Sequence, residues 1–364
     1  MGSLRVGIVG LPNAGKTTLL NALSRAGALV AAYPFTTVDP NVGVVDVPDQ
    51  RLDAIADLAG CDRRVPATVR FVDIAGLVEG ASKGEGLGNK FLAHIREVDA
   101  VVHVVRAFEA PDISHVTGTL DPVRDVELVD TELLLSDIEM VGRMLQKARR
   151  DAKGGDRESK ARADALVSLE ELVGQEPVNR RDLEERRLLG LAMEAGLLSV
   201  KPTIIVLNVG EDRESSDRYE GEIRSWAEKR DIPVLVANAE IEAELSELDH
   251  EEALEFEREM GIDEESLSRV IRASYEMLGL ITFFSIDSGE CRAWPVPKGS
   301  YATYAAGRIH TDFEKGFVKA EAVHYQDFLS CGCFAAAREE GMLRVEGREY
   351  VVQDGDVIHF KFAT

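Results

Sequence analysis

Short apolar runs alternate with helical segments over the first third of the chain and again after residue 200. Residues 4–9, 69–73 and 100–105 are rich in aliphatic and β-branched side chains. The last run is apolar at nearly every position, which is typical of a parallel strand buried on both faces. Runs at 203–207 and 233–236 continue the series. The pattern predicts a doubly wound α/β sheet, in which ligands bind at the carboxyl ends of the strands.

The strand pattern stops between residues 129 and 199, where the apolar period becomes helical. A four-three-four spacing predicts one face of a helix suited to a coiled-coil seam, formed by Leu134, Ile138, Val141 and Leu145. After a Gly-containing turn at 153–156, a second apolar face consists of Leu166, Leu169, Leu172 and Val173. We therefore expect an inserted antiparallel helical hairpin, a coiled coil, over residues 129–200.

The chain beyond residue 281 has short apolar runs of strand character. These runs are 281–286, 293–296, 318–323 and 357–360. They predict a compact α+β module of mostly β structure over 281–364. The sheet domain would then comprise residues 1–128 and 201–280.

Residues 10–17 fit the phosphate-binding loop pattern, in which two glycines separated by four residues precede Lys and Thr. A predicted strand comes before the loop and a helix-forming segment follows it. Backbone N–H groups and the helix N-terminus would bind phosphate oxygens. Lys16 would stabilise the charge that develops during phosphoryl transfer, as a catalytic residue. The nucleotide contacts expected here are Asn13, Ala14, Gly15, Lys16, Thr17 and Thr18.

A magnesium site is predicted beside this loop. Asp73 ends a predicted strand and begins an Asp-x-x-Gly motif that closes at Gly76. In phosphate-loop enzymes this carboxylate holds Mg²⁺ through water, and the glycine N–H senses the γ-phosphate. The Thr17 hydroxyl would bind the same ion. A threonine of the segment between the two motifs could complete the shell, and Thr37 is preferred to Thr36.

Selectivity for the base is expected from the segment after the 203–207 strand. Guanine-selective switch proteins place Asn-Lys-x-Asp here, whereas this chain has Asn208, Val209 and Glu211 at the corresponding positions. A carboxylate that is poorly placed to pair with guanine removes the preference of the site for guanine over adenine. We therefore expect ATP to bind at least as well as GTP. Asn238, after the 233–236 strand, could add an amide contact to the base.

The net charge of −23 argues against indiscriminate binding to bare nucleic acid, DNA included. The charge is uneven, because residues 140–162 contain eight basic and three acidic residues. This segment is either a solvated helix face or a docking site at the hairpin tip. The candidate RNA contacts are Lys147, Arg149, Arg150 and Lys153.

No apolar run approaches membrane-spanning length and no secretion signal is visible, so we expect no membrane partner. Four cysteines are too few for a disulfide framework and suit a reducing cytoplasm.

The motifs resemble those of the Obg-like ATPases, the YchF family of the translation-factor-related GTPase class. The resemblance covers nearly the whole chain and is carried by residues 10–17, 73–89, 208–211 and 307–317. It implies an OBG-type nucleotide domain with an inserted helical hairpin and a C-terminal TGS module. It also implies ATP preference and association with the ribosome, at the large subunit. The chain departs from the family at Ala14 and Thr17, where Val and Ser are usual, and at Asn238.

Hydrolysis is expected to be slow without a partner. Related switch proteins orient the attacking water with a Gln directly after Asp-x-x-Gly, but this chain has Leu77 there. The resemblance implies that His115 takes this catalytic role, although a structural histidine at a loop end is the alternative. We expect His94 and His103 to be packed side chains. Asn13 could help to hold K⁺ beside the phosphates.

The resulting hypothesis is a Mg²⁺-dependent ATPase switch that associates with the ribosome and regulates translation or a stress response. One alternative is an Obg-type GTPase. Another is a nucleotide-gated ribosome or RNA adaptor with incidental hydrolysis, which Leu77 favours and the intact set of Lys16, Thr17 and Asp73 opposes.

Overall fold

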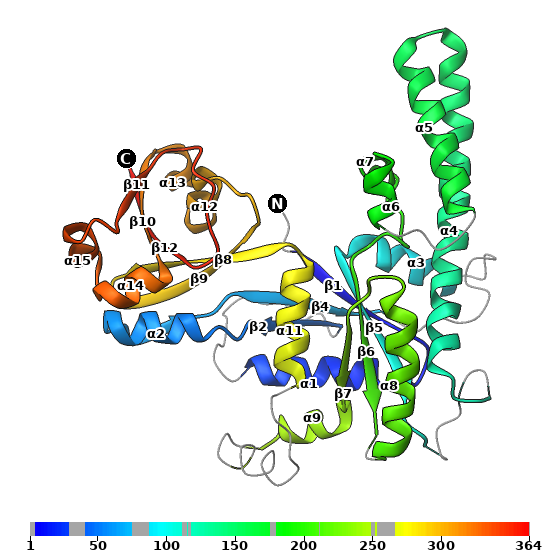
Figure 1. Ribbon diagram of the computed structural model, residues 1–364, viewed down its shortest axis with the longest axis horizontal. Coiled ribbons are helices and arrows are strands. Elements are labelled where there is room, and N and C mark those ends of the chain that lie inside the picture. The colour runs from blue at the N-terminus through cyan, green and yellow to red at the C-terminus, as the bar shows by residue number, and fades with distance from the viewer. Residues whose placement is uncertain are drawn as a thin grey trace. The chain divides into compact units, whose positions relative to one another are not determined.

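The computed structural model describes residues 4–28, 41–74, 87–110, 115, 118–174, 180–210, 212–248, 252 and 266–363 (Figure 1). The chain divides into two compact units. The first contains Met1–Gly43 and Arg70–Val270, and the second contains Val44–Val69 and Ile271–Thr364.

The first unit is built on a parallel sheet with the strand order β2-β4-β1-β5-β6-β7. Strand β1 pairs in parallel with β4 and β5, and the series continues through β6 to β7. The strands are β1 (Arg5–Val9), β2 (Val42–Asp46), β4 (Thr68–Asp73), β5 (Ala100–Ala107), β6 (Thr203–Val209) and β7 (Val234–Ala237). Every residue of β5 is buried, which confirms the prediction of a central parallel strand.

Helices of this unit connect successive strands, as the doubly wound fold requires. They are α1 (Lys16–Ala28), α3 (Leu87–Glu97) and α8 (Arg213–Glu228), while α9 (Ala239–Leu245) follows β7, and α11 (Ser266–Met277) begins in this unit and ends in the second. The predicted α/β fold is therefore confirmed. Strand β2 was not predicted, because its alternating exposure leaves only every second side chain buried.

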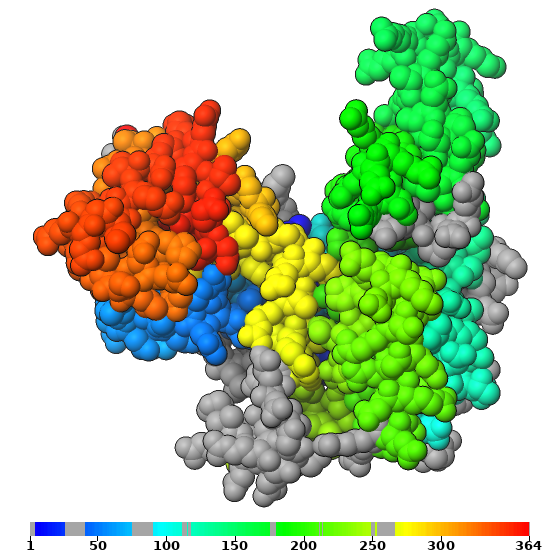
Figure 2. All heavy atoms as spheres, viewed as in Figure 1, coloured from blue at the N-terminus to red at the C-terminus, as the bar shows by residue number. Residues whose placement is uncertain are grey.

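A long helical hairpin extends from the first unit (Figure 1). It consists of α4 (Pro122–Asp151), a 3₁₀ turn η2 (Ala152–Gly154) and α5 (Arg157–Val173). Asp121 caps α4 by accepting a hydrogen bond from the Arg124 N–H, and Pro122 occupies the first turn. Gly155 has a φ of 85° and completes the turn between the helices. Figure 2 shows the hairpin end reaching beyond α7 of the same unit.

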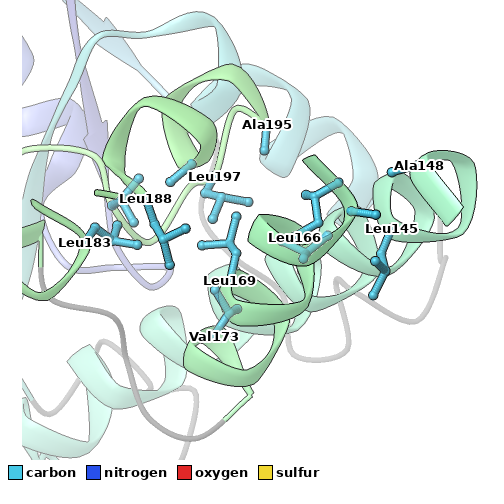
Figure 3. Packing of buried hydrophobic residues seen from close by; sticks show 13 residues of the cluster. Leu145, Ala148, Leu166, Leu169, Val173, Leu183, Leu188, Ala195 and Leu197 are labelled. Carbon is cyan, nitrogen blue, oxygen red and sulfur yellow. The ribbon is translucent and has the colours of Figure 1, made fainter. Parts of the chain in front are cut away.

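Apolar side chains hold the hairpin together and join it to α6 (Arg180–Glu185) and α7 (Leu189–Glu194). Figure 3 shows Leu145, Leu166 and Leu169 facing one another, with Leu183 and Leu188 at one end of the cluster. Of the predicted seam, Val141 and Leu145 are buried. The expectation for Ile138 is wrong, since its side chain is 38% exposed. The buried face of α4 runs through Leu133, Asp137, Val141 and Leu145, which leaves Ile138 at its edge.

The base of the hairpin is tied down by a buried carboxylate. Asp137 of α4 is fully buried and accepts hydrogen bonds of 2.8 Å from the N–H groups of Leu198 and Ser199. It also accepts one from the Ser199 hydroxyl at 2.7 Å. Burial raises the pKa of Asp137, while these three donors act in the opposite direction. The carboxylate thus fixes the segment that returns from the insertion to β6.

The second unit contains a sheet with the order β11-β10-β12-β8-β9-β3. Its strands are β3 (Arg63–Val65), β8 (Leu280–Asp287), β9 (Glu290–Pro297), β10 (Phe317–His324), β11 (Arg344–Glu346) and β12 (Asp356–Phe362). Its helices are α2 (Gln50–Ala59), α12 (Ala302–Ile309), α13 (Thr311–Lys315), α14 (Tyr325–Cys331) and α15 (Phe334–Glu339). The four predicted strands of this module are all present, as β8, β9, β10 and β12.

Residues 44–69 belong to this second unit, although the sequence suggested that they lie in the nucleotide domain. Strand β3 pairs in parallel with β9, with Arg64 opposite Cys291. The Arg51 guanidinium of α2 contacts Asp354 at 2.6 Å. These contacts join positions far apart in the sequence, so no local pattern could reveal them. None of the helices in the described part of the chain has both the length and the apolar character needed to cross a membrane.

Replacing Asp137 tests its role as the anchor of the hairpin. Asp137→Ala leaves one buried and one partly buried backbone N–H group without an acceptor, which costs about 2–4 kcal/mol. We expect a clearly lower urea midpoint, measured by far-UV circular dichroism. Glu139→Ala, at an exposed position of the same helix, is the control and should change stability by less than about 0.5 kcal/mol. Equal midpoints for the two variants would contradict the anchor role.

Candidate functional site

The loop between β1 and α1 is packed so closely against β5 and β6 that two of its positions accept only glycine. Gly10 has a φ of 150°, and a Cβ there would lie 2.3 Å from the Val104 carbonyl oxygen. Gly15 has a φ of 94°, and its Cβ would lie 2.1 Å from Asn208 Nδ2. Asn13 adopts the left-handed conformation at a φ of 63°. This backbone presents the successive N–H groups of a phosphate-binding loop.

Lys16 is the first residue of α1, and its side chain folds back over the loop. It is 8% exposed, and its ammonium group donates to the Leu11 carbonyl at 2.8 Å. Burial lowers the pKa of Lys16, and the Asp73 carboxylate opposes this shift. His103 of β5 is also buried, and desolvation together with Lys16 lowers its pKa to about 4. His103 is therefore neutral at physiological pH and adds no second positive charge beside Lys16.

Two of the predicted magnesium ligands lie together. The Thr17 hydroxyl donates to Asp73 Oδ2 at 2.7 Å, so the start of α1 and the end of β4 meet. Asp73 Oδ1 is buried and has no hydrogen-bond partner within the described residues. A hydroxyl and a carboxylate with an unsatisfied oxygen are the hard ligands that Mg²⁺ prefers, so the residues present fit the ion. Thr37 and Gly76 lie outside the described residues.

Asn208 connects the phosphate loop to the segment after β7. Its side-chain amide donates to the Ala14 carbonyl, and its oxygen accepts from the Ala239 N–H, both at 3.0 Å. The side chain is 5% exposed. Both of its polar atoms are thus used within the protein, which makes Asn208 a bracket for two loops. The sequence carried no signal for this, since both partners are backbone groups.

The other residues predicted to contact the base occupy different surroundings. Val209 ends β6 and packs against an apolar cluster of the sheet. The Asn238 oxygen accepts from the N–H groups of Glu240 and Ile241 at 3.1 Å and caps α9. That oxygen is therefore committed to the helix, and only the amide nitrogen remains to donate to a base. Glu211 lies outside the described residues.

His115 lies beside the phosphate loop and is paired with a carboxylate. Its Nε2 is 2.8 Å from Asp125 Oδ2. Both side chains lie with Pro12 and Ala14 of the loop around a gap too small to hold a water molecule. Leu77, which the sequence linked to slow hydrolysis, is outside the described residues. Sequence reasoning missed Asp125, because a carboxylate in the first turn of α4 is also what a helix N-terminus favours.

The expectations for the two other histidines have different outcomes. His103 is buried, as predicted. His94 is exposed on α3, so the prediction that it is packed is wrong. Its position on the amphipathic helix turns it to solvent, between the buried Phe91 and Ile95.

All four residues of the predicted basic cluster lie at the tip of the hairpin. Lys147, Arg149 and Arg150 lie in the last two turns of α4, and Lys153 lies in η2. All four side chains are exposed. Cations at a helix C-terminus are also favoured by the helix dipole, so part of this pattern serves the helix itself.

The parallel sheet, the glycine-restricted loop and the Thr17–Asp73 contact define a P-loop nucleotide hydrolase. The protein-family model described as "50S ribosome-binding GTPase" matches residues 5–133 of this chain. The YchF-GTPase_C model, whose description states no function, matches residues 280–363.

Full-length relatives refine this class. A protein of Pasteurella multocida, "Ribosome-binding ATPase YchF", is 47% identical and covers 98% of this chain and 99% of its own length. The rat "Obg-like ATPase 1" is 40% identical over 100% of this chain and 93% of its own. The solved Schizosaccharomyces pombe "YchF GTPase" superposes with a TM-score of 0.89 at 35% identity, covering 99% of this chain and 98% of that one. The chain therefore belongs to the YchF family.

The close approach of Asn208 to Gly15 can be tested by adding one methyl group. Gly15→Ala would force the Asn208 bracket to move, so we expect affinity for a fluorescent ATP analogue to fall at least about tenfold, or about 1.4 kcal/mol. Gly155→Ala is a matched control, because Gly155 also has a positive φ of 85° but open space around it. Equal affinities in the two variants, with both folded by circular dichroism, would show that the bracket does not shape the site.

Proposed function

We propose that this protein is a Mg²⁺-dependent ATPase that binds the ribosome and acts as a nucleotide-controlled switch. The observation that carries the proposal is the 2.7 Å contact between Thr17 and Asp73 beside the buried Lys16. Thr17 and Asp73, with Thr37, would hold the metal. When bound, Mg²⁺ neutralises charge on the β- and γ-phosphates.

The chain's own groups perform the remaining steps. Backbone N–H groups of the loop from Asn13 to Thr18 would bind the phosphates, and Lys16 would stabilise charge on the transferred group. The Gly76 N–H would sense the γ-phosphate, so that nucleotide exchange or hydrolysis changes the adjoining segment. His115, next to the loop, would orient the attacking water in place of the Gln that Leu77 replaces.

Adenine is the preferred base in this proposal. Two relatives carry names that state an ATPase. The base-facing segment of this chain, with Val209 and Glu211, lacks the Asn-Lys-x-Asp pattern that pairs with guanine. Asn208 is occupied between two loops, so its contribution to base selection is through their position.

An Obg-type GTPase is the second candidate, since one solved relative is described as a GTPase. A third candidate is a nucleotide-gated ribosome or RNA adaptor with incidental hydrolysis. It would show partner binding that depends on the nucleotide without any stimulation of turnover.

The ribosome is the proposed partner, because relatives are named ribosome-binding. The exposed cluster of Lys147, Arg149, Arg150 and Lys153 offers a charge complementary to ribosomal RNA, and we propose that it contacts the large subunit. In this proposal the protein would act in the cytoplasm as a regulator of translation or a stress response, with neither membrane nor DNA as a partner.

Steady-state turnover of ATP and GTP, with and without ribosomes, tests the proposal. We expect slow basal ATP hydrolysis that ribosomes accelerate, with GTP used no better than ATP. The assay in K⁺ and in Na⁺ tests the proposed K⁺ beside Asn13, which should raise turnover. Preferential GTP hydrolysis would favour the second candidate. Ribosome binding that follows the bound nucleotide, with unchanged turnover, would favour the adaptor.

Neutralising the tip tests the docking surface. One variant carries Gln at all four tip positions, Lys147, Arg149, Arg150 and Lys153. It retains helix propensity and lacks four positive charges. We expect weaker ribosome co-sedimentation and a shallower dependence on salt. The control carries Gln at four exposed cations elsewhere in the first unit, namely Arg180, Arg181, Arg218 and Lys229. If the two proteins co-sediment equally, the tip is not the docking site.

A further inference from the structure

We propose that Asp125 is a positioning residue that holds His115 beside the phosphate loop, and that it does so from the helix that carries the basic tip. The inference rests on the proposed function, because it assigns a support to the histidine that would orient the attacking water.

The two side chains form a close and sheltered pair. His115 Nε2 lies 2.8 Å from Asp125 Oδ2, and the side chains are 10% and 5% exposed. Asp125 comes from the first turn of α4 and His115 from the segment before that helix. Water has little access to either group, so the pair is not a screened surface contact.

The pair is placed at the nucleotide site. The gap that His115 and Asp125 line is also lined by Leu11, Pro12 and Ala14. Ala14 is next to Gly15 and is held by Asn208 through its carbonyl. A side chain at this gap is therefore adjacent to the backbone that would bind phosphate.

The surrounding charges make the hydrogen bond to His115 important for Asp125. Burial raises the pKa of Asp125, and the bond to His115 is the largest opposing influence. Arg124 of α4 also favours the carboxylate, whereas Asp121 of α4 disfavours it. Two side chains of β5 also lie near Asp125, namely the buried Arg106 guanidinium and the neutral His103.

The second carboxylate oxygen of Asp125 is in an energetically unfavourable environment, which is common at functional sites. Asp125 Oδ1 is buried and lacks a hydrogen-bond partner within the described residues. A carboxylate is costly to keep in such a place for packing alone. The bond from Oδ2 to the imidazole offsets part of this cost and gives the buried carboxylate a role in placing the histidine.

That role follows from the chemistry of histidine. A carboxylate that accepts the Nε2–H fixes which ring nitrogen carries the proton and also fixes the ring plane. The same logic underlies catalytic bases that are oriented by a third group. Asp125 would thus act on the water only through His115.

The position of Asp125 also links the pair to the hairpin. Helix α4 runs without interruption through 30 residues, and its stretch from Asp125 to Lys147 is about 33 Å long at 1.5 Å per residue. A shift of α4 on docking would displace Asp125 relative to His115. The pair gives the tip a direct mechanical route to the nucleotide site.

Turnover, ATP affinity and the state of the imidazole test the inference together. Asp125→Leu removes the acceptor at similar size, and Asp125→Asn keeps an oxygen that can accept the Nε2–H. We expect kcat to fall about 10- to 100-fold in Asp125→Leu and less in Asp125→Asn, with unchanged ATP affinity. Nitrogen-15 NMR of labelled histidine, assigned with His115→Ala, should show the proton fixed on Nε2 in the unaltered protein and not in Asp125→Leu.

A matched variant and His115→Ala separate the possible failures. Asp130→Leu removes another carboxylate from the same helix and should leave kcat and the His115 signal unchanged. His115→Ala could lower turnover while both Asp125 variants turn over ATP as fast as the unaltered protein, or faster. That result would overturn the positioning role of Asp125 and leave the catalytic role of His115 standing. If His115→Ala keeps normal turnover, the histidine has no part in hydrolysis and the inference falls with that part of the proposed function.

Discussion

The nucleotide site depends on the close packing of the phosphate loop against two buried strands, β5 and β6. Gly10 lies against the Val104 carbonyl of β5, and Gly15 lies against the Asn208 side chain at the end of β6. Asn208 in turn bonds the backbone at Ala14 and Ala239. A loop held on both sides in this way has little conformational entropy left to lose when phosphate binds, which is the physical meaning of a preorganised site.

Helix α4 connects three functions along one rigid element. Asp125 in its first turn holds His115, Asp137 anchors the hairpin base, and the cluster at the far end is exposed to solvent. Packing with α5 buries one face of the helix over much of its length. A helix that is fixed at its base and packed along its side can transmit a displacement instead of absorbing it by bending.

The second unit shows how far a local pattern can be trusted. Its strands β10 and β12 were predictable, because each contains a run of consecutive buried, mostly apolar residues that stands out in the sequence. Residues 44–69 were not, since β3 has only three residues and joins β9 across more than two hundred positions. The chain passes between the two units at residues 43–44, 69–70 and 270–271. Two of these passages lie within β2 and β4, and β4 ends at Asp73. The third passage lies within α11, so two strands and one helix carry the chain from one unit to the other.

The sequence by itself determined the phosphate loop, the order of the parallel strands along the chain, the helical hairpin and the family. Each of these depends on neighbouring residues, whose spacing sets backbone geometry and the periodicity of burial. Only the tertiary structure decided that Asn208 is a bracket, that Asn238 caps a helix, that Ile138 and His94 face solvent, and that Asp125 supports His115. Those roles arise from contacts between side chains and distant backbone or from the rotation of a helix in its surroundings. A hydrogen bond between positions far apart leaves no pattern in a single sequence, so the fold must bring its partners together before the bond can be recognised.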